Sequence, residues 1–87
     1  MLMKRRFYFN QFYIKHEDGK KIIVFIDSIS EREHTIEHPA FYIKKENSSF
    51  FVYAYLSDRN TKIIYDKLFY NEESAYEFHD HISNLAF

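Results

Sequence analysis

The strongest structural signal in the chain lies at residues 12–26, which read FYIKHEDGKKIIVFI. Asp18-Gly19 stands between two runs rich in β-branched and aromatic residues, and this arrangement is a strong hairpin signal. Gly19 is the only glycine in the chain, and it occupies the turn position that needs a positive φ. We therefore expect antiparallel strands at about 5–16 and 20–29. A two-residue turn gives these cross-strand pairs: Ile14 with Ile23, Phe12 with Phe25, and Tyr13 with Val24.

The first of these strands changes its pattern part-way along. Phe7 and Phe9 share one side of an extended chain. Phe12 and Ile14 share the other side, so the change falls at Asn10-Gln11. A β-bulge there would return both pairs to the same core. The alternative is that both faces of the strand are covered.

Residues 30–38 carry a helix-like signal. Ser30 and Glu33 have the spacing of a capping box, and Pro39 would end the helix. Ile36 is the only apolar residue in this segment. We therefore expect a short, mostly exposed helix.

Three further strands are expected in the second half of the chain. β-Branched and aromatic residues at 40–46, 49–57 and 62–69 favour strands, with turns at Asn47-Ser48 and 58–61. The first of these turns gives the pairs Ile43 with Val52 and Phe41 with Ala54.

The last segment has a helical period. Apolar residues recur there at spacings of three and four, which predicts a helix at about 72–85 with Asn71 as its N-cap. The apolar stripe consists of Ala75, Phe78, Ile82 and Leu85. The order of elements is then β-β-(short helix)-β-β-β-α, which predicts the α+β class. We expect residues 1–87 to form a single domain, with a five-stranded, mainly antiparallel sheet and the C-terminal helix packed on one face.

Composition excludes several classes of protein. The chain has 87 residues and a formal charge of −1, with 46% hydrophobic and 21% aromatic residues. Because there is no cysteine, disulfides, thiol chemistry and Cys-type zinc sites are excluded. No apolar run approaches the roughly 20 residues that span a bilayer. We expect a cytoplasmic protein with no membrane association and no cofactor.

The amino-acid composition also reflects the base composition of the gene. Phe, Tyr, Met, Ile, Asn and Lys, which have AT-rich codons, greatly outnumber Gly, Ala, Arg and Pro. This bias indicates an AT-rich genome, such as that of a low-GC bacterium, its phage or plasmid, or a virus. Compositional drift in a cellular gene is the alternative.

Aromatic residues fall on both faces of the predicted sheet, whereas one helix covers only one face. The strand at 49–57 places Phe51, Tyr53 and Tyr55 on its second side, and Tyr42 and Lys44 of the neighbouring strand join them. Tyr-rich surfaces with few charges are typical of interfaces. We therefore expect this face to bind a protein partner or, in a homodimer, a second copy of the chain. A tightly coiled half-barrel that hides both faces is the alternative.

Acidic residues of the predicted C-terminal helix offer a second surface for a partner. Glu73, Glu77 and Asp80 lie away from the apolar stripe, next to Glu72, and form a stripe suited to a basic surface. A solvated helix face is the alternative.

Binding of single-stranded nucleic acid is a second candidate function. Basic residues surround aromatic ones near the start of the chain, and single-strand binders stack bases on such aromatics. The residues are Lys4, Arg5, Arg6, Phe7, Tyr8, Phe9 and Lys15. Against this, nucleic-acid-binding domains are usually strongly basic, whereas this chain is slightly acidic. A basic strand end that keeps a sheet edge soluble explains the same residues.

Motifs for catalysis or metal binding are weak. The run 34–38, His-Thr-Ile-Glu-His, resembles the H-x-x-E-H string of the inverzincin metalloproteases over five residues only. Pro39 would cut short the helix that such a site needs. We expect solvated histidines without metal, and no catalytic residues, because there is also no nucleophile elbow or glycine-rich loop.

These observations together predict a small, non-enzymatic module that acts by stoichiometric binding to a protein. It would be an accessory protein, regulator or inhibitor of a phage or other mobile element. The alternatives are a single-stranded nucleic-acid binder and a structural subunit of a homo-oligomer.

Overall fold

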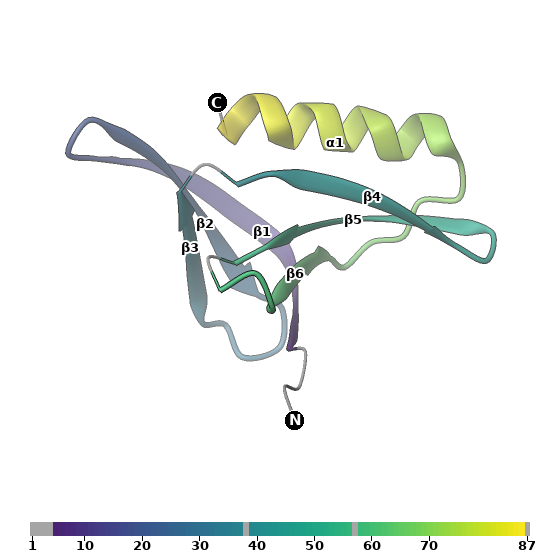
Figure 1. The fold of residues 1–87 in the computed structure, drawn as a ribbon, viewed down its shortest axis with the longest axis horizontal. Helices are drawn as coiled ribbons and strands as arrows, with labels where there is room; N and C mark the ends of the chain where they lie inside the picture. Colours follow the sequence, from purple (N-terminus) through teal and green to yellow (C-terminus); the bar gives the residue numbers. More distant parts are fainter. Residues whose placement is uncertain (1–4, 38, 57, 87) are drawn as a thin grey trace.

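The computed structural model describes residues 5–37, 39–56 and 58–86, and Figure 1 shows its elements. The strands are β1 (Arg6–Glu17), β2 (Lys20–Asp27), β3 (Glu33–Glu37), β4 (Phe41–Glu46), β5 (Ser49–Tyr55) and β6 (Lys62–Tyr65), and the helix is α1 (Glu72–Ala86). These elements confirm an α+β fold with a C-terminal helix.

The strands form a mixed sheet in the order β3-β2-β1-β6-β5-β4. Two antiparallel meanders, β1-β2-β3 and β4-β5-β6, meet at its centre, where β1 and β6 run parallel. The expectation of five mainly antiparallel strands is therefore wrong in detail, since the described residues form six strands with a parallel central pair. The parallel pair joins segments far apart in the chain, from Arg6 opposite Lys62 to Phe9 opposite Tyr65. Short-range sequence patterns do not indicate such a pairing.

Both predicted hairpins are confirmed in register. The pairing of β1 with β2 contains all the predicted pairs, and Asp18 and Gly19 have φ values of 54° and 76°. The pairing of β4 with β5 also contains the predicted pairs, and Asn47 at its turn has a φ of 57°. Positive φ is typical of tight hairpin turns, and Gly, Asn and Asp adopt it at the least cost.

A β-bulge interrupts β1 where the change of pattern predicts it. Phe9 lies opposite Asp27, and Gln11 lies opposite Ile26, so Asn10 is the extra residue. The bulge allows apolar side chains on both sides of it to contact one core: Phe7, Phe9, Phe12 and Ile14.

The expected helix at 30–38 is wrong, because these residues include the edge strand β3. Ile36 is buried in the core from this strand, and a short exposed helix would not bury it. The capping box does not form, since the hydroxyl of Ser30 accepts a hydrogen bond from the N–H of Arg32 at 3.3 Å. Glu31 has a φ of 62°, which is incompatible with a right-handed helix.

The final strand is shorter than expected, since β6 ends at Tyr65 rather than at residue 69. The N–H of Asp66 still donates to the carbonyl oxygen of Phe9 at 2.9 Å. The chain then bends away, and Phe69 rejoins the sheet through an isolated bridge to Phe50.

The helix α1 lies over β4 and β5 on one face of the sheet (Figure 1). Asn71 caps it as predicted, because its Oδ1 accepts a hydrogen bond from the N–H of Ser74 at 2.8 Å. Ile82 of the helix is fully buried, and the helix residue Phe78 stacks its ring on that of Tyr65 with centroids 4.0 Å apart. The fully buried larger side chains come from both meanders and the helix: Phe9, Ile23, Val24, Phe25, Val52, Ile63 and Ile82.

The face of the sheet opposite α1, its second face, is covered by no other element of the described chain. Part of this face is nevertheless hidden from solvent. Tyr13 of β1 reaches across β2, and its hydroxyl donates to Oε1 of Glu33 on β3 at 3.0 Å. This side chain helps to bury Val24, which is fully buried on that face. Both faces of β2 are therefore hidden, as the half-barrel alternative predicts. On β5 the second face is hidden only in part, since Phe51, Tyr53 and Tyr55 are half-buried there.

Candidate functional site

The tyrosine face is the part of the sheet's second face formed by Tyr42, Phe51, Tyr53 and Tyr55. Residues two apart on a strand share a side, and Tyr42 of β4 pairs with Tyr53 of β5, so these strands bring all four rings together. The rings of Tyr42 and Tyr53 stack with centroids 5.5 Å apart. Tyr55 meets the two rings edge-on at 6.0 and 5.6 Å. Phe51 lies 5.8 Å from Tyr53, and the exposed Lys44 pairs with Phe51 on the same side.

Lys62 belongs to this site, although the sequence reasoning missed it. Its ammonium group lies 4.9 Å from the ring centroid of Tyr53 and 5.8 Å from that of Tyr55. Both distances are within the range of cation–π attraction. Burial raises the pKa of the Tyr53 hydroxyl, and the neighbouring Tyr55 adds to this effect. Alternation along β6 places Lys62 on the side of Ile64, but only the sheet order shows that this side continues the tyrosine face.

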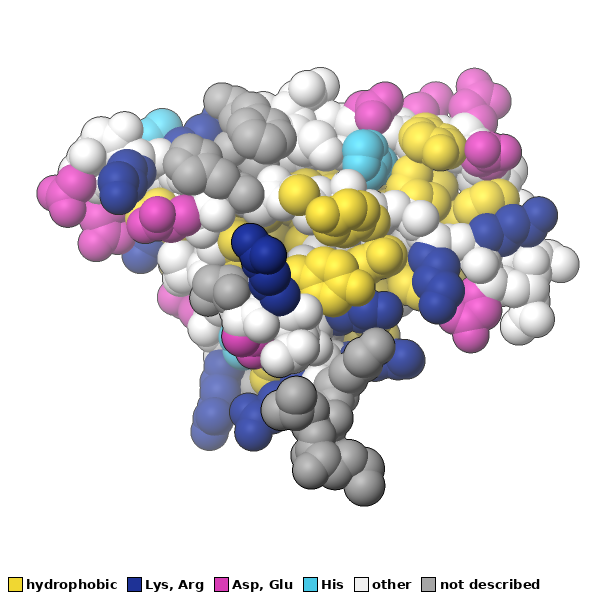
Figure 2. All heavy atoms as spheres, viewed as in Figure 1, with side chains coloured by type: hydrophobic (Ala, Val, Ile, Leu, Met, Phe, Trp, Pro, Cys, Tyr) yellow, Lys and Arg dark blue, Asp and Glu magenta, His cyan; other side chains and the backbone are white. Residues whose placement is uncertain are grey.

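The tyrosine face extends toward β1. Ile64 of β6 lies between Tyr8 and Tyr53 in the register, and Tyr8 is exposed on the same side. A hollow of about 460 Å³ lies there, lined in part by Arg6, Tyr8 and Phe51. Figure 2 shows hydrophobic side chains gathered over β4 and β5 below the helix, with Lys and Arg side chains around them. Positive charge therefore borders the aromatic surface.

The acidic residues predicted as partner contacts lie on a different surface. Glu73, Glu77 and Asp80 are exposed on α1, which packs on the core face of the sheet. His79 helps to hold the helix there, because its Nε2 donates to the carbonyl oxygen of Phe41 at 2.9 Å. The structure therefore separates the acidic stripe from the tyrosine face.

The aromatic residues predicted to stack on bases do not share one surface. Phe9 is fully buried, and Phe7 packs against the core on the same side of β1. Neither ring is placed to stack on a base. Of the three aromatic residues, only Tyr8 lies on the same side of the sheet as the tyrosine face.

The basic residues of the same prediction are spread along β1. Arg6 and Lys15 lie on the side of the tyrosine face, but Lys15 is near the far hairpin, 3.3 Å from the carboxylate of Glu17. Arg5 is exposed next to the start of β6, and Lys4 lies outside the described residues.

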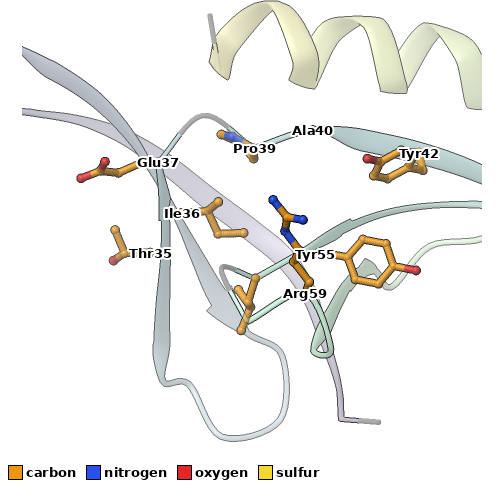
Figure 3. Close-up of a pocket in the computed structure, with 9 residues that line it drawn as sticks. Thr35, Ile36, Glu37, Pro39, Ala40, Tyr42, Tyr55 and Arg59 are labelled. Carbon is orange, nitrogen blue, oxygen red and sulfur yellow. The ribbon is translucent and has the colours of Figure 1, made fainter.

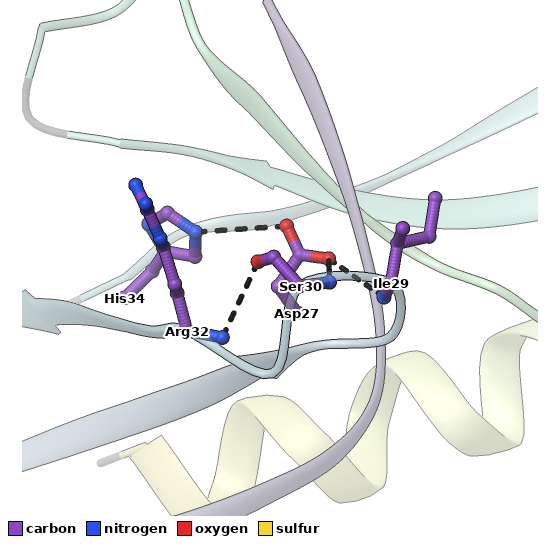
Figure 4. A network of polar contacts seen from close by, with 5 residues as sticks. All are labelled: Asp27, Ile29, Ser30, Arg32 and His34. Atoms are coloured by element: carbon purple, nitrogen blue, oxygen red, sulfur yellow. Dashed lines mark hydrogen bonds and ion pairs between the residues drawn. The ribbon is translucent and has the colours of Figure 1, made fainter.

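The H-x-x-E-H string forms no metal cluster within the described residues. His34 and Glu37 are three apart on a strand, so they point to opposite faces, and His38 lies outside the described residues. His34 is not the solvated loop residue expected from the sequence. Its ring lies 4.3 Å from that of Phe7, and its buried Nε2 is 3.9 Å from the carboxylate of Asp27 without a hydrogen bond (Figure 4).

Asp27 holds the turn between β2 and β3 (Figure 4). Its side chain accepts hydrogen bonds from the N–H groups of Ser30 at 3.0 Å and Ile29 at 2.8 Å, and it is only 5% exposed. These bonds lower the pKa of the Asp27 carboxyl group. They assign a structural role to this carboxylate.

A groove of about 830 Å³ lies between the edge strand β3 and the ends of β4 and β5 (Figure 3). Ile36 of β3 and Arg59 of the β5–β6 turn point into it from opposite sides. Tyr42 and Tyr55 also line the groove, so it is continuous with the tyrosine face.

Comparisons with protein-family models, curated proteins and solved structures found no match for this chain. Within the described residues, no helix combines the length and the apolar composition needed to cross a membrane.

Proposed function

We propose that this protein is a small, non-enzymatic protein-binding module that acts stoichiometrically through the tyrosine face. The observation that supports this most directly is a cluster of four aromatic rings on a sheet face that no other described element covers. Tyrosine supplies large contact area at low entropy cost, and clustered aromatic residues often carry most of the energy of an interface.

The packing of the rings favours a protein over unpaired bases. Base stacking needs free ring faces. The ring of Tyr53 already has the ring of Tyr42 and the ammonium group of Lys62 next to it. Two of the predicted stacking residues, Phe7 and Phe9, lie on the core side of β1. The tyrosine face is therefore better suited to a shaped apolar contact than to a stack of bases.

Single-stranded nucleic acid is the second candidate ligand, and one observation favours it. Arg6, Lys44 and Lys62 lie on the same side of the sheet as the tyrosine face. Phosphate groups bind such basic borders, and the resulting affinity falls steeply with salt.

A homodimer through the tyrosine face, or a structural homo-oligomer, is the third candidate. A symmetric pairing of this face would place Lys44 and Lys62 of both copies in one interface. Like charges at an interface oppose association, so the charge pattern favours a different partner with an acidic surface.

We further propose a cytoplasmic regulatory or inhibitory role for a phage or other mobile element. The support for this is compositional: the AT-rich codon bias and the absence of cysteine.

Matched substitutions test the proposed function. Tyr42→Ser removes a ring of the tyrosine face that is 45% exposed, and Tyr70→Ser removes one outside this face that is 79% exposed. We expect Tyr42→Ser to reduce the amount of protein captured from a lysate of the source cells at least tenfold, or about 1.4 kcal/mol. Tyr70→Ser should leave it unchanged, and urea denaturation should show that both variants are folded.

The same variants separate the three candidates. If Tyr42→Ser captures as much protein as the parent, the tyrosine face is not the binding surface. Light scattering that shows a dimer lost in Tyr42→Ser would support the homo-oligomer instead. A shift of a single-stranded oligonucleotide that weakens with salt and with Tyr42→Ser would support nucleic-acid binding.

A further inference from the structure

We propose that the protein partner inserts an extended, acidic segment into the groove beside β3, where it adds to the sheet as a further strand. This inference rests on the proposed function, because it names the kind of partner that the binding module takes.

The strand β3 has a free edge. It is an end strand of the sheet, and within the described residues it pairs only with β2. Unpaired edges bind extended chains through backbone hydrogen bonds. At the other end of the sheet, β4 carries three consecutive charged residues, Lys44, Lys45 and Glu46, of the kind that protects an edge. β3 carries its charged residues, Glu33 and Glu37, at its two ends, and its middle has the uncharged, β-branched Thr35 and Ile36.

The size and lining of the groove suit a short strand. β3 has five residues, which correspond to about 17 Å of extended chain at about 3.3 Å per residue. The groove of about 830 Å³ runs along Thr35, Ile36 and Glu37 of this strand, and its lining is mixed: Pro39, Ala40 and Leu56 add apolar groups beside the polar ones. A strand added beside β3 would place every second side chain on this lining.

Two charged residues line the groove, Arg59 and Glu37. The carboxylate of Glu37 is 4.0 Å from the ammonium group of Lys20, whereas Arg59 has no ion pair within the described part of the chain. Figure 3 shows its guanidinium group between β3 and the end of β5. The carboxylate of the adjacent Asp58 binds within the β5–β6 turn. It accepts hydrogen bonds from the Thr61 hydroxyl at 2.7 Å and from the N–H groups of Thr61 and Asn60 at 2.9 Å. A carboxylate on the incoming segment is the natural partner for Arg59.

The shared residues Tyr42 and Tyr55 connect this groove to the tyrosine face. One partner can therefore place an extended segment in the groove and a folded surface on the aromatic cluster.

Selection from a displayed library of random short peptides, with the full chain as target, supplies the probe. We expect the selected peptides to alternate apolar residues with others and to contain Asp or Glu. Arg59→Gln should weaken their binding at least tenfold, whereas Arg32→Gln, an exposed arginine outside the groove, should not. Bound peptide should slow amide hydrogen exchange in β3. The two alternating sets of peptide nitrogens point to opposite edges of an added strand, so each set is methylated in turn. Methylation of the set that faces β3 should abolish binding, because it removes the backbone donors to β3 and leaves the protein unchanged.

Two results would overturn the inference while the proposed function stands. In the first, the peptides slow exchange in β5 but not in β3, and Phe51→Ser weakens them while Arg59→Gln does not. In the second, methylation of neither alternating set of peptide nitrogens changes the affinity, so no strand is added. The proposed function itself fails only when protein capture does not depend on the tyrosine face.

Discussion

Replacement of Asp27 by Asn should destabilise the protein in a manner that depends on pH. The carboxylate of Asp27 is 5% exposed and accepts hydrogen bonds from the N–H groups of Ile29 and Ser30. A hydrogen bond to a charged acceptor contributes about 1.5–3 kcal/mol, against about 0.5–1.5 kcal/mol for a neutral one. Asn keeps an acceptor oxygen but loses the charge, so two weakened bonds predict a loss of about 2 kcal/mol near neutral pH.

The sign of the pH dependence follows from the direction of the pKa shift. The pKa of Asp27 is lower in the folded chain than in the unfolded chain. Its contribution is therefore complete above the unfolded value of about 3.9 and is lost as the pH falls through the folded value. The parent and Asp27→Asn should consequently differ by about 2 kcal/mol near neutral pH and converge in strong acid.

Urea denaturation of the parent and Asp27→Asn over a pH series measures this difference. A loss of about 2 kcal/mol should lower the midpoint by roughly 1–2 M urea. Asp80→Asn, which changes an exposed carboxylate on α1, serves as the control and should leave the stability nearly unchanged at every pH. A difference for Asp27→Asn that is below about 0.5 kcal/mol, or that stays constant down to strong acid, would refute the reasoning.

Three other substitutions test the fold. Phe9→Ala should cost about 3–5 kcal/mol in urea denaturation because Phe9 is fully buried, and a cost below about 1 kcal/mol would contradict its place in the core. Asn71→Ala should cost about 1 kcal/mol and reduce the helical signal in circular dichroism, since it removes the cap on Ser74; an unchanged stability would argue against the cap. Glu31→Gly should stabilise the protein by up to about 1 kcal/mol, measured by thermal denaturation, because Glu31 has a φ of 62°; a lower melting temperature would contradict this backbone conformation.

The parts of the fold that could be predicted are those set by neighbours in the sequence. Turn chemistry at Asp18-Gly19 determines the β1–β2 register, and the apolar period at 72–85 predicts α1. The strand β3 could not be predicted, because the local capping pattern at Ser30 is overridden by the burial of Ile36 against β2. The pairing of β1 with β6 depends on contacts between the two meanders, which no local pattern encodes.

The candidate site, like the fold, could be predicted only where it depends on residues that are close in the sequence. Alternation along 49–57 was enough to place Phe51, Tyr53 and Tyr55 on one side, and their contacts with Tyr42 follow from the hairpin register. Lys62 and Tyr8 join them only because β6 lies between β1 and β5, which is a property of the sheet order. The sequence predicts Phe7 and Phe9 on a binding surface because the side of β1 that faces the core is not evident from the strand alone.

The parallel pairing of β1 with β6 has a consequence for how fast this chain folds. Each meander closes over short turns, whereas Arg6 and Lys62 meet across most of the chain. The entropy of closing that long loop opposes folding until the core between the meanders is buried, so their docking should be the slow step. Until then the inner edges of β1 and β6 stay open to strands of other chains. The folding rate and the tendency to aggregate are therefore controlled by the same event, the meeting of the two halves of the sheet.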